Sequence, residues 1–191
     1  MAHVWNGRLA GFLVFGAIGG LVLPSDALAN GTSNWNGSQS SDWFEAENWD
    51  GGIVPSGNDV AITQAPNAVI SGGGSAETAQ VIIGDSVGQT GRLVVEGVGS
   101  TLATDPAKLL IIGLSGSGEM TVRNGGSVST GGGTFIAAFP DGVGTATIRD
   151  AGSTLFVGDE LAVGREGTGS MAILNGGRVE SEEGFIGRNM G

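Results

Sequence analysis

The chain has 191 residues, with 19 acidic and 8 basic side chains, a net charge of −11 and no cysteine. Nucleic acids and anionic membranes both bind basic surfaces, so the charge argues against either partner. Disulfides are excluded, and the fold must depend on its core and on backbone pairing. The 38 glycines show no three-residue period and alternate with short β-branched runs, which indicates an ordered, β-rich chain rather than collagen or disorder.

The first 29 residues are predicted to be a secretory signal peptide. Arg8 precedes an uncharged, mostly apolar run of 15 residues, Leu9 to Leu23, and the small-x-small sequence Ala27-Leu28-Ala29 follows. We expect cleavage after Ala29 and export through the inner membrane. The run is shorter than the roughly 20 apolar residues of a membrane-spanning helix, which leaves an uncleaved N-terminal anchor as the less favoured alternative.

Residues 30–75 are expected to form an N-terminal cap together with the first coil of a repetitive fold. This segment contains Trp35, Trp43, Phe44 and Trp49. The first coil of a solenoid exposes one end of its core, and an atypical terminal segment must cover it. The alternative is that the aromatic faces stack on sugars. The cap is favoured because every solenoid needs one.

A phrase with alternating apolar residues recurs from residue 88 onward, in "RLVVE", "EMTVR", "TATIR" and "SMAIL". Alternate side chains of a strand point to opposite faces, so one face of each phrase is predicted to enter the core. The predicted core ladder consists of Leu93, Val95, Met120, Val122, Ala146, Ile148, Met171 and Ile173.

A turn follows each of these strands, written "GVGS", "NGGS", "DAGS" and "NGGR". Glycine adopts positive φ without steric cost, and Asn and Asp tolerate it best among the other residues. The predicted turn residues are the third-position glycines Gly99, Gly126, Gly152 and Gly177, with Asn124, Asp150 and Asn175 leading three of the turns.

Two further short apolar strands complete each repeat of about 25–27 residues, and a last, incomplete copy begins at Gly184. This spacing is too long for a meander of hairpins, too short for a propeller blade and lacks a six-residue period. The predicted fold is therefore all-β: a parallel β-helix over residues 76–191, in which each strand pairs with its equivalent one repeat later. In such a stack Glu96 should lie opposite Arg123.

The segment "WNGS…DWFEAENWDGGIVPSGNDVAI" (from Trp35 to Ile62) resembles the start of bacterial autotransporter passenger domains. The repeat from Ile112 to Val128 is similar to the type V secretion/PEP-CTERM-associated repeat. The resemblance implies a right-handed β-helix displayed outside a Gram-negative cell, adhesin-like or part of a matrix. It also implies a translocator barrel or a C-terminal sorting signal; the sequence contains neither, so we expect a truncated N-terminal part.

Residue types argue against catalysis. The chain lacks Cys and Tyr, its one histidine is His3, and Lys108 is its one lysine. Triads, thiol nucleophiles and His-based zinc sites are excluded beyond the signal peptide. Paired carboxylates for polysaccharide cleavage would have to come from Asp159 and Glu160, or from Glu180, Glu182 and Glu183. Weak calcium binding at "GNDVA", "FPDGVG" or "SEEG" is possible, but no metal or cofactor site is predicted.

We therefore expect a non-catalytic β-solenoid, secreted or associated with the outer membrane at the cell surface, with an adhesive or scaffolding role. Surface glycans, host proteins or matrix proteins are its expected partners. An extracellular matrix protein of the PEP-CTERM type is the first alternative, and a polysaccharide-acting β-helix enzyme is the second.

Overall fold

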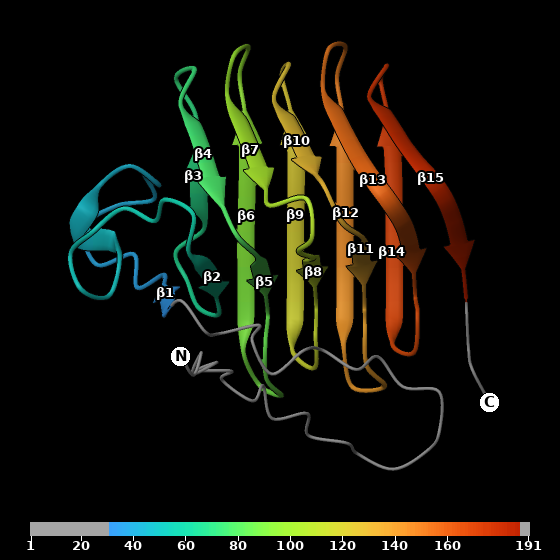
Figure 1. The fold of residues 1–191 in the computed structure, drawn as a ribbon, viewed down its shortest axis with the longest axis horizontal. Helices are drawn as coiled ribbons and strands as arrows, with labels where there is room; N and C mark the ends of the chain where they lie inside the picture. Colours follow the sequence, from blue (N-terminus) through green and yellow to red (C-terminus); the bar gives the residue numbers. More distant parts are fainter. Residues whose placement is uncertain (1–30, 188–191) are drawn as a thin grey trace, which may run out of the picture.

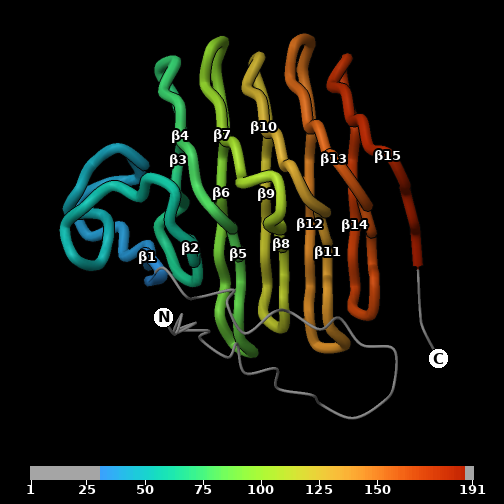
Figure 2. The backbone as a smooth tube through the Cα atoms, viewed as in Figure 1, coloured from blue at the N-terminus to red at the C-terminus, as the bar shows by residue number. Residues whose placement is uncertain are grey.

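The computed structural model describes residues 31–187, and the predicted signal peptide lies outside them. The chain winds into a β-solenoid of about six turns, which confirms the all-β parallel architecture. From residue 68 onward, each coil places one strand on one side and either two short strands or one longer strand on the other (Figure 1). The tube view shows the coils advancing side by side from the N-terminal cap toward the last strand (Figure 2).

One side is a five-stranded parallel sheet. Its three central strands have seven residues each, and every one pairs in register with its equivalent in the next coil. Its strands are β3 (Ala68–Ile70), β6 (Thr90–Glu96), β9 (Ser117–Arg123), β12 (Val143–Arg149) and β14 (Thr168–Leu174).

The other side is a ten-stranded sheet in which most coils contribute two short strands. In β13 and β15 the two short strands are joined into one long strand. Its members are β1 (Thr32–Asn34), β2 (Asp59–Ile62), β4 (Ser75–Thr78), β5 (Val81–Ile83), β7 (Thr101–Thr104), β8 (Leu110–Ile112), β10 (Ser127–Thr130), β11 (Thr134–Ile136), β13 (Thr154–Val163) and β15 (Arg178–Ile186).

The core lies between the two sheets and consists of stacked inward side chains. Six members of the predicted ladder are fully buried: Leu93, Val95, Met120, Val122, Ala146 and Ile148. The last two depart from the prediction, because Met171 is only partly buried and Ile173 is 50% exposed. Both belong to β14, the last strand of its sheet, which has a neighbouring strand on the β12 side alone among the described residues.

The short strands β5, β8 and β11 are buried on both faces. Leu110 and Ile112 face the main core, while Ile111 points the other way and joins a second apolar cluster with Ile82 and Phe135. A strand covered on both sides has no polar face. This explains why "VII" and "LII" read as continuous apolar runs rather than alternating ones.

The turns after the long strands come in two lengths that alternate from coil to coil. Glu96 is in register with Arg123, and Thr101 is in register with Ser127. The stretch from Glu96 to Thr101 is nevertheless one residue longer than the stretch from Arg123 to Ser127. The next two coils repeat the difference, with a longer turn from Arg149 to Thr154 than from Leu174 to Arg178.

This alternation corrects the predicted role of two glycines. Positive φ occurs at Gly99 and Gly152 (both 85°) and at the leading residues Asn124, Asp150 and Asn175 (55°, 73° and 50°). In the shorter turns, however, Gly125 and Gly176 adopt it, not Gly126 and Gly177. Those two are needed for space instead, since a Cβ on Gly126 would lie 2.5 Å from the Val95 carbonyl oxygen, and one on Gly177 would lie 2.5 Å from that of Ile148.

Candidate functional site

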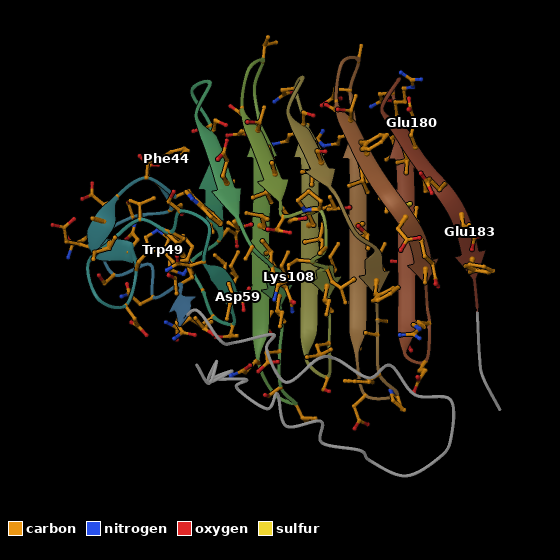
Figure 3. The ribbon with its side chains drawn as sticks, in the orientation of Figure 1. Phe44, Trp49, Asp59, Lys108, Glu180 and Glu183 are labelled. Atoms are coloured by element: carbon orange, nitrogen blue, oxygen red, sulfur yellow. The ribbon has the colours of Figure 1, made fainter. Side chains whose placement is uncertain are left out.

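The three tryptophans of the N-terminal segment are buried at the start of the solenoid. Trp35, Trp43 and Trp49 are 1%, 0% and 1% exposed. Trp49 packs edge-on against both others, with ring centroids 5.1 Å from Trp35 and 4.7 Å from Trp43. Figure 3 shows Trp49 inside this N-terminal lobe and Phe44 at its surface. The alternative in which the indole faces stack on sugars is wrong for these three residues. Of the four aromatic residues in residues 31–75, Phe44 alone (37% exposed) has an accessible ring.

A buried asparagine, which the sequence analysis missed, holds the cap together. The Asn48 side chain is 0% exposed. Its Oδ1 accepts hydrogen bonds from the backbone N–H groups of Gln39 (2.8 Å) and Ser40 (2.9 Å), and its Nδ2 donates to Ser40 Oγ and to the Asp42 carbonyl (both 2.9 Å). All four hydrogen-bonding positions of the amide are used. The sequence signal was a polar Asn directly before Trp49, and in the structure Asn48 is the last residue of the short 3-10 helix η2 (Ala46–Asn48).

The candidate catalytic carboxylates do not converge on an enclosed site. Glu180 forms an ion pair with Arg178, and Glu182 and Glu183 are exposed. Glu183 lies in register with Glu160 of the neighbouring strand. In Figure 3, Glu180 and Glu183 lie at separate points along β15. The arrangement is a row of surface acids along two adjacent strands.

Two titratable regions have shifted pKa values. A hydrogen bond between the exposed side chains of Glu45 and Glu47 raises the pKa of Glu45 and lowers that of Glu47. Burial raises the pKa of Asp59, which is 3% exposed, and the nearby Lys108 partly opposes the shift. Asp59 Oδ1 has no hydrogen-bond partner among the described residues. Within residues 31–187 no three potential metal-ligating carboxylates or histidines gather at one point.

The outward face of the five-stranded sheet presents ordered polar side chains. Its side chains form rows across β6, β9, β12 and β14, with Arg92 opposite Glu119, Thr121 opposite Thr147, and Glu96 opposite Arg123. The expected Glu96–Arg123 pair is present, at 2.6 Å between Arg123 Nε and Glu96 Oε2. Arg92 Nε lies 3.2 Å from Glu119 Oε2, and the Thr145 and Ser170 hydroxyl oxygens are 3.1 Å apart. Neighbouring coils thus fix each other's polar side chains.

The described residues also contain no helix with the length and hydrophobicity needed to cross a bilayer. No known family model and no solved structure matches the sequence. Over 104 residues, or 53% of the chain, the sequence is 36% identical to the uncharacterized lipoprotein YdeK of Escherichia coli K12. The chain spans 8% of the length of that relative, so the similarity concerns a small part of a much longer protein.

Proposed function

We propose that this chain is the non-catalytic, surface-displayed β-solenoid of an exported protein and has an adhesive or scaffolding role. The observation that carries the proposal is the outward face of the five-stranded sheet. It presents hydroxyl and charged side chains in fixed rows, on strands that the underlying core holds rigid. A surface of this kind is ordered before it meets a partner, which lowers the entropic cost of binding.

The name of the relative supports a location in the cell envelope. YdeK is called a lipoprotein, and a lipid anchor holds a protein at a membrane surface. The Trp-rich start and the repeats resemble autotransporter passengers, which are displayed outside the cell. We infer that the chain belongs to such a displayed passenger.

Bead adhesion tests this role directly. The purified chain is coupled to fluorescent beads, and bead retention on immobilised bacterial cells and on purified surface polysaccharide is counted under flow. We expect retention to fall at least severalfold when Thr121→Glu and Thr147→Glu place two charges on the outward face. The matched control, Ala103→Glu with Ser129→Glu, adds the same charges to neighbouring strands of the opposite sheet.

Two outcomes would overturn the proposal. Wild-type beads that are not retained above uncoated beads would remove the adhesive role. Equal losses in both double variants would show that added negative charge, rather than this face, controls retention.

The non-catalytic part of the proposal has its own test. Incubation of the purified chain with acidic polysaccharides should release no new reducing ends.

A further inference from the structure

A groove lined mostly by polar residues lies where the first coil meets the second. Its volume is about 520 Å³, within the range of small-ligand sites. One wall is the loop between β2 and β3, represented by Thr63–Ala65 and Asn67. The other wall is the start of β6 and the turn before it, represented by Gly88–Thr90 and Arg92.

The groove exists because β3 is shorter than the strand it pairs with. Ala68–Ile70 pair with Leu93–Val95 only, whereas β9 pairs with β6 along its whole length from Thr90. Over Thr90–Arg92 the β3 side of β6 therefore has no strand partner among the described residues. Thr90 and Arg92 are exposed at this position, whereas Gly91 is buried.

The walls of the groove are fixed by contacts with the cap and the turn. Trp35 Nε1 donates to the Pro66 carbonyl (2.8 Å), and Gln64 Nε2 donates to the Trp35 carbonyl (3.3 Å). On the other side the Ser86 N–H donates to Gln89 Oε1 (2.9 Å). The buried tryptophan thus positions one wall, and little ordering remains to be done when a ligand binds.

The lining chemistry matches a polyhydroxyl ligand. Asn67, Thr63 and Thr90 contribute an amide and two hydroxyls, which both donate and accept hydrogen bonds as sugar hydroxyls do. The Gln64 amide contributes its oxygen as an acceptor and the Gln89 amide its NH2 group as a donor, since their other polar atoms are bonded within the walls. The lining contains no carboxylate, although the chain has 19 acidic residues.

Charge favours a neutral ligand over an acidic one. The one cation of the lining, Arg92, is already paired with Glu119 at 3.2 Å. The net charge of −11 also repels polyuronates. We propose that this groove binds a neutral oligosaccharide. The proposal rests on the adhesive function above and specifies its ligand class, since Arg92 belongs both to the groove and to the polar face.

An NMR titration of the purified, ¹⁵N-labelled chain tests the proposal. Maltotriose, cellotriose and chitotriose are the neutral probes, and trigalacturonate and the peptide Gly-Ser-Gly are the competing classes. We expect at least one neutral trimer to shift the side-chain amide signals of Gln64, Asn67 and Gln89 at concentrations up to about 10 mM. No shift with any neutral trimer, shifts confined to another surface, or tighter binding of the uronate or the peptide would each overturn it.

Variants separate the groove from the rest of the surface. Asn67→Ala with Gln89→Ala should weaken binding of the active trimer at least about tenfold, while Ser129→Ala on the opposite sheet leaves it unchanged. Gln89→Glu keeps an oxygen for the Ser86 N–H but removes the amide donors, and should also weaken binding. An unchanged Trp49 indole signal reports that each variant is folded, since Trp49 Nε1 donates to the Trp43 carbonyl and neither residue lines the groove. Wild-type affinity in both groove variants would contradict the proposal.

The bead assay distinguishes failure of the groove from failure of the adhesive function. If wild-type beads and Asn67→Ala/Gln89→Ala beads are retained equally and no trimer binds, the groove proposal is wrong and the adhesive function stands. If a trimer binds the groove but wild-type beads are not retained, the adhesive function is wrong.

Discussion

At the scale of single residues, two buried serines connect the longer turns to the shorter ones. Ser153 Oγ accepts a hydrogen bond from the Gly125 N–H (3.0 Å), and Ser100 Oγ accepts one from the Gly73 N–H (3.0 Å). Both serines are 0% exposed. Each buried hydroxyl therefore satisfies a backbone donor of the preceding coil.

Removing such a hydroxyl should destabilise the fold. We expect Ser153→Ala to lower the free energy of unfolding by about 1–3 kcal/mol, because the Gly125 N–H loses its acceptor. The exposed Ser129 is the matched control, and Ser129→Ala should change stability by less than about 0.5 kcal/mol. Urea unfolding followed by circular dichroism measures both. Equal effects of the two substitutions would show that the turn hydrogen bond contributes nothing.

Asp59 should make stability depend on pH. Burial raises its pKa in the folded chain above the ordinary value of 3.8, so the folded state binds the proton more tightly than the unfolded state does. This contribution is complete below pH 3.8 and is lost as pH rises through the folded pKa. The free energy of unfolding of the wild type should therefore fall relative to Asp59→Asn between pH 3.8 and neutrality. A constant difference between the two proteins across that range would contradict the buried position of this carboxylate.

At the scale of elements, a column of glycines explains the repeated G-x-G of the strand starts. Gly91, Gly118, Gly144 and Gly169 are in register across the five-stranded sheet. A Cβ on Gly118 or Gly144 would collide with the carbonyl oxygen of Ile83 or Ile112 on the opposite sheet. The two sheets approach so closely at this edge that no side chain fits between them.

Adding one methyl group in this column should therefore be costly. Gly144→Ala would place Cβ 2.6 Å from the Ala137 amide nitrogen, and backbone would have to move. We expect a loss of roughly 1–3 kcal/mol or more in unfolding free energy. Gly184→Ala is the control, since its nearest neighbour would be Ser181 Oγ at 3.8 Å, and it should be neutral or stabilise by less than about 1 kcal/mol. Similar thermal midpoints for both variants would refute the close approach.

Local patterns predict the strands but not the turn lengths. Alternation in "EMTVR" identifies Met120 and Val122 as inward residues, because the side-chain period of a strand is a local property. "GVGS" and "NGGS" look equivalent in sequence, yet Gly126 aligns in space with Ser100 rather than with Gly99. That one-residue offset depends on where the following strand pairs with its neighbour in another coil. Contacts between coils therefore decide which glycine needs positive φ.

At the scale of the whole molecule, sites depend on segments that are distant in the sequence. The Trp-rich start predicted a cap, but not that Trp35 would also hold Pro66 at the wall of a groove. The groove joins residues 63–67 to residues 88–92, and it requires β3 to be shorter than β6. No periodic pattern encodes a missing stretch of strand, because the first coil departs from the repeat.

The two ends of the described solenoid should differ in local stability. A stacked fold gains stability from contacts between neighbouring coils, so a coil opens more readily where its apolar side chains are less covered. At the N-terminal end Trp35, Trp43 and Trp49 are all buried, whereas Ile173 is 50% exposed in β14 and Ile186 is 89% exposed in β15.

Hydrogen exchange of the purified chain tests this difference. Amide protons of β14 and β15 should exchange at least about tenfold faster than those of β9, whose Met120 and Val122 are fully buried, because less free energy is needed to open them. Amides of Trp43 and Trp49 are the control, since they also lie in an end segment but should stay protected under the packed indoles. Equal protection in β9 and β14 would mean that the solenoid opens as one cooperative unit, and uniformly fast exchange at both ends would mean that the tryptophan cluster does not act as a cap.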